Sequence, residues 1–245
     1  VLLEQILNSD EVKKLNVKYK KKRRLQNKQA LNEAHDYYYG LRTVDWNDIH
    51  TKEEHEVLQY MKQRGFDERA LKKNSQDYRA DRLRDYLRAY PFLFPILDNG
   101  EFKGWVGRTM NKYVEKKRKY LYNDGFRKRD TLCGTYEQNK VVFVCEGFMD
   151  YLSLRTRGHI KNVVAILGWH ISDEQVQKLK DKGVTTVVSA LDNDKAGNKG
   201  TEYLKRFFHV IRFDYPEGVK DAGEMSEQEL KMAIRRTRRA YKRDS

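Results

Sequence analysis

The sequence predicts an α/β protein, α+β overall, with a mainly parallel sheet flanked by helices and preceded by a helical and small β N-terminal subdomain. Two observations predict this class. In the last hundred residues, apolar strands alternate with helical segments, which is the chain order of a parallel sheet. These strands are apolar along their whole length, as expected where helices cover both faces of the sheet.

The first 75 residues read as helical. Apolar residues at 2–7 open one amphipathic stretch, and those at 57–61 mark another that stops at Gly65. The dense basic run Lys18–Arg24 lies between them, and it fits either a grip on a nucleic-acid backbone or a solvated helix face. The three tyrosines at 37–39 fit either base stacking or a partly buried aromatic cluster.

A hairpin is expected from residue 91 onward. The apolar run 91–97 meets the turn signal Asp98-Asn99-Gly100, and a second apolar stretch follows at 102–106. A further basic stretch covers 116–129.

Four buried strands are expected in the rest of the chain, at 141–145, 163–167, 184–191 and near 210–213. Capping boxes open two of the helices between and after them, Ser172 with Gln175 and Ser226 with Glu229. The resulting division is a helical basic N-terminal subdomain at 1–90, a β-rich basic segment at 91–138, an α/β catalytic domain at 139–225 and a C-terminal basic helix at 226–245.

The charge of the chain points to a polyanionic partner. The chain contains 50 Lys and Arg residues and 36 Asp and Glu residues, which gives a net charge of +14 and a pI near 9.5. Each phosphate neutralised by such a surface releases counterions, although a merely solvated surface would look the same. The two cysteines, Cys133 and Cys145, form no C-x₂-C pair, so neither a structural zinc site nor a disulfide framework is expected. With no spanning apolar run or signal peptide, we expect a cytoplasmic protein away from membranes.

Three acidic motifs follow strands in the last hundred residues. Glu146 comes directly after the first strand with Asp150 four residues on, Asp192 and Asp194 follow the third strand, and Asp221 lies beyond the fourth. An open α/β sheet places its site beyond the carboxyl ends of its strands. A single acid there is often only a helix cap, but three such clusters in order predict a divalent-metal site. Two such ions would suit an in-line phosphoryl displacement.

The segments EGFMDYLSL, ALDNDKAGNKG and VKDAGE resemble, in order and position, the three signature motifs of the Toprim fold. The resemblance implies that Glu146, Asp192, Asp194 and Asp221 form a metal-binding acidic centre, with Glu146, Asp192 and Asp194 as catalytic residues. It implies that Asp150 is a fifth metal-binding member or supports the other ligands.

Upstream segments resemble bacterial DnaG-type DNA primase catalytic cores, and the similarity covers about residues 55–225. They are HEVLQYMKQRGFDERALKK, FPILDNGEFKGWVGRTM and KYLYNDGFRKRDTLCGTY. By position, Arg108, Lys119 and Lys128 match basic residues that line the family's nucleic-acid and nucleotide groove. VKDAGE is nearer to phage primase-helicases than to the D-P-D form of bacterial enzymes. The sequence holds neither zinc-ribbon ligands nor a P-loop helicase motif.

The resemblance implies a nucleotidyltransferase that makes short RNA primers on a single-stranded DNA template with Mg²⁺, for which Mn²⁺ can substitute. Its implied partners are ribonucleoside triphosphates, the RNA–DNA hybrid product and a replicative helicase, in a bacterial or phage-infected cell. Two alternatives stay open, a Mg²⁺-dependent Toprim nuclease and a nucleic-acid-binding accessory subunit with a dormant site. His170, in the segment Gly168-Trp169-His170, fits either a contact to a nucleotide or template strand or a structural role.

Overall fold

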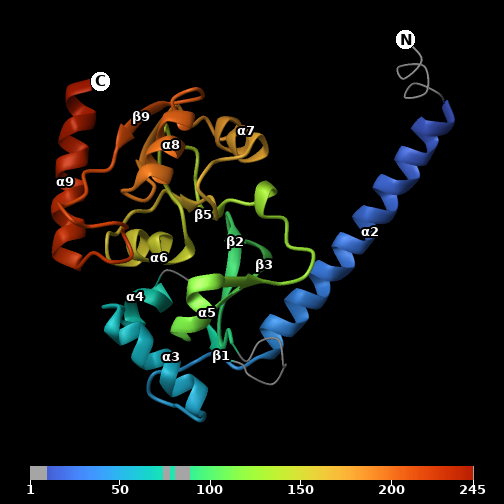
Figure 1. The fold of residues 1–245 in the computed structure, drawn as a ribbon, viewed down its shortest axis with the longest axis horizontal. Helices are drawn as coiled ribbons and strands as arrows, with labels where there is room; N and C mark the ends of the chain where they lie inside the picture. Colours follow the sequence, from blue (N-terminus) through green and yellow to red (C-terminus); the bar gives the residue numbers. More distant parts are fainter. Residues whose placement is uncertain (1–9, 74–77, 81–88, 245) are drawn as a thin grey trace.

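The structure, a computed structural model, describes residues 10–73, 78–80 and 89–244. The predicted amphipathic stretch at 2–7 lies outside the described residues. The expected helical start is otherwise present as α2 (Asp10–Gly40), α3 (Lys52–Gln63) and α4 (Glu68–Lys73). Figure 1 shows α2 running away from the body of the molecule, while α9 (Glu227–Asp244) lies along the opposite side. The basic run Lys18–Arg24 belongs to α2, and only its backbone is described.

The predicted hairpin is confirmed. Strand β2 (Phe92–Asp98) pairs antiparallel with β3 (Glu101–Arg108) across a turn in which Asn99 and Gly100 both have positive φ, 50° and 85°. Such a two-residue turn matches the right-handed twist of its strands. Two short strands complete this region: β1 (Arg79–Ala80) pairs with β2, and β4 (Tyr120–Tyr122) pairs with β3.

The four expected strands are β6 (Val141–Cys145), β7 (Val163–Ala165), β8 (Thr186–Ala190) and β9 (His209–Arg212). They are parallel and lie in the order β7-β6-β8-β9. Strand β7 is shorter than predicted because the buried Leu167 has a φ of +58°, which an extended strand does not allow.

One sheet joins the hairpin region to the parallel strands. Strand β5 (Cys133–Thr135) pairs antiparallel with β7 and meets β2 at its end, so the predicted boundary near 138 falls inside a continuous sheet. The buried carboxylate of Asp98 reinforces the junction by accepting hydrogen bonds from the Tyr136 hydroxyl, the Leu132 amide and the Lys178 ammonium group.

Helices cover both faces of the parallel sheet, as the apolar strands predicted. Along β6, Phe143 and Cys145 face the core under α6 (Phe148–Thr156) and α9, while Val142 and Val144 face the core under α7 (Asp173–Asp181) and α8 (Lys195–Leu204). Both predicted capping boxes are present, at Ser172–Gln175 and Ser226–Glu229. Two shorter elements, α5 (Lys112–Lys117) and the 3₁₀ turn Lys128–Asp130, connect the hairpin region to β5.

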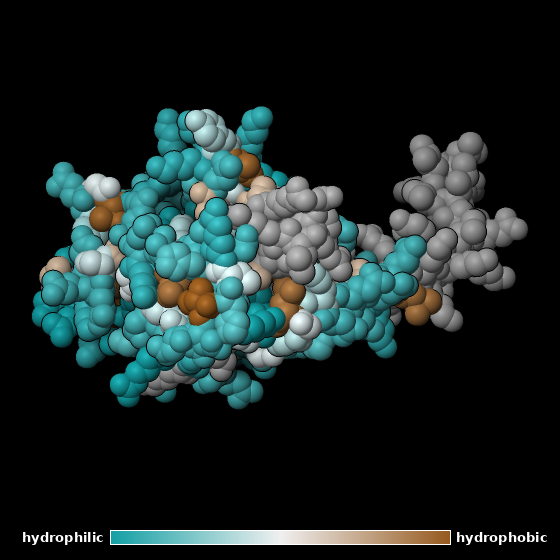
Figure 2. Space-filling model, turned by 90° about the horizontal axis from the view of Figure 1, so that it is seen from below, coloured by the Kyte–Doolittle hydropathy of each residue, from teal (hydrophilic) through white to brown (hydrophobic). Residues whose placement is uncertain are grey.

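The surface fits the highly charged composition. The face in Figure 2 is mainly hydrophilic, with small separate hydrophobic areas. The tyrosines at 37–39 belong to an aromatic cluster with Phe102 and Trp105, and Tyr38 is fully buried, which favours the packing interpretation of these residues. None of the described helices combines the length and the apolar character needed to cross a bilayer.

Candidate active site

The strand order places the three acidic motifs side by side. Strands β6, β8 and β9 are neighbours in the sheet and run in the same direction, so their carboxyl ends share one edge. Glu146 follows β6 directly, Asp192 stands two residues beyond β8, and Asp221 lies in the loop after β9. The strand order therefore brings the loops that carry the three acidic motifs to one edge of the sheet.

Hydrogen bonds tie the second and third acidic loops together. The Asn193 amide donates to the Lys220 carbonyl at 2.6 Å, and the Asn193 side chain donates to the Val219 carbonyl at 3.2 Å. The Lys220 ammonium group lies 3.4 Å from an oxygen of Asp192 and 3.5 Å from an oxygen of Asp194. This lysine supplies a positive charge between the two carboxylates, and sequence reasoning assigned it no role although it directly precedes Asp221.

Asp150 joins the first acidic loop to the third. It is buried, and its two carboxylate oxygens accept from the Gly147 amide at 3.1 Å and the Gly223 amide at 3.0 Å. Burial, followed by repulsion from Asp221 and Asp192, raises the pKa of Asp150 well above its usual range. Through these two hydrogen bonds, the Asp150 carboxylate links the backbones of the first and third acidic loops.

A buried arginine that the sequence interpretation missed lies beneath the third loop. Arg157, on the turn after α6, donates to the Gly223 carbonyl, the Ser153 hydroxyl and the Arg64 carbonyl at the end of α3. Its guanidinium also lies 4.7 Å from the centre of the Phe66 ring. It therefore connects the helical N-terminal region to the acidic centre. No pattern in the sequence marks a single arginine as buried.

The acidic centre is short of positive charge. Burial, and then the nearby Asp192 and Asp194, raise the pKa of Glu146 to about 7. The pKa of Asp192 is raised by burial and by Asp221, whereas that of Asp194 is lowered because its carboxylate caps α8 by accepting from the Gly197 and Ala196 amides. Within the described residues, no three His, Cys, Asp or Glu side chains already form a metal cage. The donors are nonetheless hard oxygen ligands whose mutual repulsion a divalent cation would relieve, so they fit such an ion.

A cleft of about 480 Å³ opens beside Glu146, and its lining includes the predicted basic residues Lys119 and Lys128. Lys128 lies 5.0 Å from the centre of the Tyr122 ring, and partial burial lowers its pKa despite the opposing influence of Glu146. The rest of the lining is Arg118, Tyr120, Tyr122, Gly147, Leu167 and Gly168. Glu146 therefore shares the cleft with three cations, Arg118, Lys119 and Lys128, which we call the basic wall.

Arg108, the third predicted basic residue, does not line this cleft. It is 1% exposed, and its guanidinium donates to Glu115, to the Tyr60 hydroxyl and to the Lys119 carbonyl. Arg108 contacts the backbone of Lys119 rather than the cleft itself, so it lies behind the basic wall.

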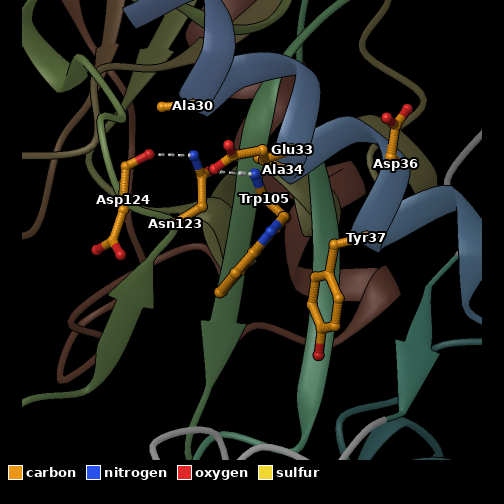
Figure 3. Close-up of a pocket in the computed structure, with 8 residues that line it drawn as sticks. All are labelled: Ala30, Glu33, Ala34, Asp36, Tyr37, Trp105, Asn123 and Asp124. Atoms are coloured by element: carbon orange, nitrogen blue, oxygen red, sulfur yellow. Dashed lines mark hydrogen bonds between the residues drawn. The ribbon is translucent and has the colours of Figure 1, made fainter. Parts of the chain in front are cut away.

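A second cavity lies away from the acidic motifs. It measures about 450 Å³ between α2 and the hairpin region, where Figure 3 shows Asn123 accepting from the Trp105 amide and donating to the Asp124 carbonyl. Its charged lining residues are Glu33, Asp36 and Asp124, so it lacks the cations that a phosphate-bearing substrate requires.

Comparison with known proteins agrees with this architecture. A family model described as Toprim-like matches residues 143–226, which hold all three acidic motifs. The fold and the acidic loops thus define a Toprim-type domain. The chain is 30% identical over 159 residues to the uncharacterised protein MG010 of Mycoplasma genitalium, covering 62% of this chain and 68% of that protein. It is 30% identical over 140 residues to the DNA primase of Buchnera aphidicola and 26% identical over 232 residues to that of Staphylococcus aureus.

These alignments cover 53% and 75% of this chain but only 22% and 36% of the two primases, so the chain matches about a third of such a protein or less. Among solved structures, the zinc-binding and RNA polymerase domains of the Aquifex aeolicus primase superpose with a TM-score of 0.64 at 25% identity, over 86% of this chain and 60% of that one. A DnaG catalytic domain bound to single-stranded DNA shares the fold, with a TM-score of 0.63 at 19% identity, over 89% and 79%. The chain belongs to the Toprim family of DnaG-type primase catalytic cores.

Proposed function

We propose that this chain synthesises short RNA primers on single-stranded DNA by metal-dependent nucleotidyl transfer. One observation carries the proposal: the acidic loops after β6, β8 and β9 share one edge of the sheet, and Glu146 of the first loop lines a cleft together with the cations of the basic wall. A nucleoside triphosphate and a template backbone both carry negative charge, so they fit the basic wall, while the acidic loops fit the cations that accompany a triphosphate. The family's named DNA primases, and the DnaG domain with bound single-stranded DNA, support the proposal.

We assign metal binding to Glu146, Asp192, Asp194 and Asp221, and we propose Mg²⁺ as the ion, with Mn²⁺ as a substitute. The support is the donor set itself, since Mg²⁺ prefers a few carboxylates completed by water and substrate phosphates. When bound, such ions neutralise charge on the transferring phosphoryl group and on the leaving group. Asp150 is assigned to holding the Glu146 and Asp221 loops at a fixed separation, through its two amide contacts.

In the proposed reaction, the primer's 3′-hydroxyl oxygen forms a bond to the α-phosphorus of the incoming ribonucleotide. The bond from that phosphorus to the bridging oxygen breaks, and pyrophosphate leaves. Glu146 is assigned to accept the hydroxyl proton, because it is the carboxylate that lines the cleft. Asp194, fixed by its cap on α8, holds the second loop rigid.

Lys119 and Lys128 are assigned to phosphate contacts along the basic wall, and Arg108 to positioning the Lys119 backbone. The proposal keeps the division into a helical region at 1–90, a basic β-rich region at 91–138, a catalytic region at 139–225 and a terminal helix at 226–245. It also includes a replicative helicase partner, which rests on the family resemblance alone, and the cytoplasmic location expected from the sequence.

The test is a primer-synthesis assay on single-stranded DNA with labelled ribonucleotides and Mg²⁺ or Mn²⁺, resolved on a denaturing gel. Asp192→Asn removes one charge of the acidic centre. Asp214→Asn is the matched control, because Asp214 is exposed and pairs with Arg236 away from the cleft. The proposal expects short RNA products from the parent and from the control, with a loss of at least about 100-fold in Asp192→Asn. Template shortening without RNA products would assign a nuclease instead.

A further inference from the structure

A row of four aromatic side chains begins in the loop after β7 and continues at the end of α8 and in the turn that follows it. The Trp169 and His170 rings are stacked, with centres 4.9 Å apart and planes inclined at 29°. His170 then contacts Tyr203 at 5.3 Å, and Tyr203 contacts Phe207 at 5.3 Å. We call these four residues the aromatic row.

The aromatic row begins on the surface, and its other end packs against the hydrophobic core that contains Val176 and Leu179. Trp169 is 52% exposed, His170 is exposed, and Tyr203 and Phe207 are partly buried. An exposed tryptophan stacked on an exposed histidine gains little from burial, so packing alone does not account for the arrangement. Accessible ring faces are instead the feature with which proteins hold unpaired nucleobases.

The fold holds the row in place. Gly200 of α8 lies so close to the Trp169 backbone that an added methyl group would come within 2.3 Å of the Trp169 carbonyl oxygen. The loop starts at Leu167, whose left-handed backbone is unfavourable for a branched side chain. A close helix contact and a strained residue therefore position an exposed ring.

The row starts at the rim of the cleft. Leu167 and Gly168 line the same cavity as Glu146, Lys119 and Lys128, and Trp169 is the next residue of that loop. A strand that passes through this cleft would therefore meet Trp169 on leaving it on the β7 side.

Cations accompany the rings. The Arg206 guanidinium lies 5.1 Å from the centre of the Tyr203 ring and 5.9 Å from that of Phe207, and the Lys180 ammonium group lies 5.5 Å from the Phe207 ring. A neighbouring basic cavity of about 720 Å³ on α8 is lined in part by Lys195, Lys199 and Lys205. Rings interleaved with cations match a ligand that presents bases and phosphates together, whereas an apolar protein surface would leave these charges unpaired.

We propose that the aromatic row is a base-stacking platform for the single-stranded DNA template next to the catalytic cleft. This inference rests on the proposed function for its choice of template. Trp169 and His170 stack on unpaired bases, while Arg206 and Lys180 contact the phosphates. Since every base has a π-face, the platform holds DNA without reading its sequence.

The test measures binding by the whole chain to a labelled oligo(dT) of about twelve nucleotides, in EDTA, by fluorescence anisotropy. A second oligonucleotide of equal length carries abasic sites in place of bases. The variants are Trp169→Ala, Trp169→Phe and Tyr113→Ala. Tyr113 is the matched control because it is 84% exposed but lies on α5, away from the row.

The expected result is an affinity for oligo(dT) about 5- to 100-fold lower in Trp169→Ala, with Trp169→Phe and Tyr113→Ala close to the parent. The slope of log K against log salt should stay unchanged, because no phosphate contact is removed. On the abasic strand, Trp169→Ala should bind as the parent does. In the parent, oligo(dT) should also quench tryptophan fluorescence, and this quenching should disappear in Trp169→Phe.

Equal affinities of the parent and Trp169→Ala for oligo(dT) would overturn the inference, and so would an equal loss on the abasic strand. If no nucleic acid quenches the tryptophan fluorescence of the parent, the inference is also overturned, and the row is then a protein-docking face. Oligo(U) bound more tightly than oligo(dT) through Trp169 would replace the DNA template by the RNA product. Because the assay needs no catalysis, a positive result together with absent primer synthesis would refute the proposed function and leave the platform standing.

Discussion

Neutralising Glu146 should stabilise the metal-free protein, by an amount that grows between about pH 4.5 and 7 and is complete above pH 7. Crowding and burial raise the pKa of this glutamate from its usual 4.5 to about 7. Below about pH 4.5 the group is protonated in both the folded and the unfolded chain. Between pH 4.5 and 7 only the unfolded chain ionises, so this contribution to stability is lost as the pH rises and is fully lost above 7.

The size of the effect follows from the two pKa values. Their difference corresponds to about 3 kcal/mol at 1.36 kcal/mol per unit, and partial exposure of the cleft reduces this to about 1–2 kcal/mol. Glu146→Gln should therefore unfold with a free energy about 1–2 kcal/mol higher than the parent at pH 8, and with nearly the same free energy at pH 5.

The assay is urea unfolding in EDTA at the two pH values, with Glu137→Gln as the matched control, since Glu137 is exposed at the end of β5. Saturating Mg²⁺ at pH 8 should reverse the order, because the parent keeps a ligand that the variant lacks. Equal stability of parent and Glu146→Gln at pH 8, or the same gain at both pH values, would refute the crowding argument.

Three further substitutions probe the frame of the site. Asp98→Ala should lower the free energy of unfolding by about 2–4 kcal/mol, because it leaves Tyr136 and Lys178 without their shared acceptor. Denaturant unfolding measures this loss, with Asp124→Ala, on an exposed turn, as the control. Gly197→Ala should reduce nucleotide incorporation at least about 10-fold, because the new methyl group would lie 1.9 Å from the Asp192 carbonyl oxygen; activity equal to the parent would contradict this. Asp150→Ala leaves the Gly147 and Gly223 amides unpaired, so it should weaken Mn²⁺ binding about 10- to 100-fold, as measured by titration calorimetry. Unaltered binding would mean that the two loops keep their positions without Asp150.

The sequence predicted those elements of the fold that have a local, periodic residue pattern. The apolar runs identified the parallel strands, and Asn99-Gly100 identified the hairpin, because these patterns depend on local periodicity and turn geometry. It could not predict that β5 joins the hairpin to the parallel strands, since a three-residue strand carries too little pattern.

In the candidate site, too, the sequence predicted the local pattern but not the long-range contacts. The order of the motifs after β6, β8 and β9 predicted where the carboxylates gather. It could not show that both oxygens of Asp150 are held by amides, that Arg108 lies behind the basic wall, or that Lys220 sits between two carboxylates. Those facts depend on contacts between residues that are distant in the chain, which local spacing does not encode.

The central claim is that the acidic centre transfers nucleotides, and extension of a primer already annealed to a DNA template tests it most directly. Such a substrate bypasses initiation, so the assay reports the transfer chemistry without any need for start-site recognition. With one complementary ribonucleoside triphosphate and Mg²⁺, the account predicts one pyrophosphate released for each nucleotide added, in the parent and in Asp214→Asn but not in Asp192→Asn. Extension that survives in Asp192→Asn, or strand shortening without pyrophosphate in the parent, would contradict it.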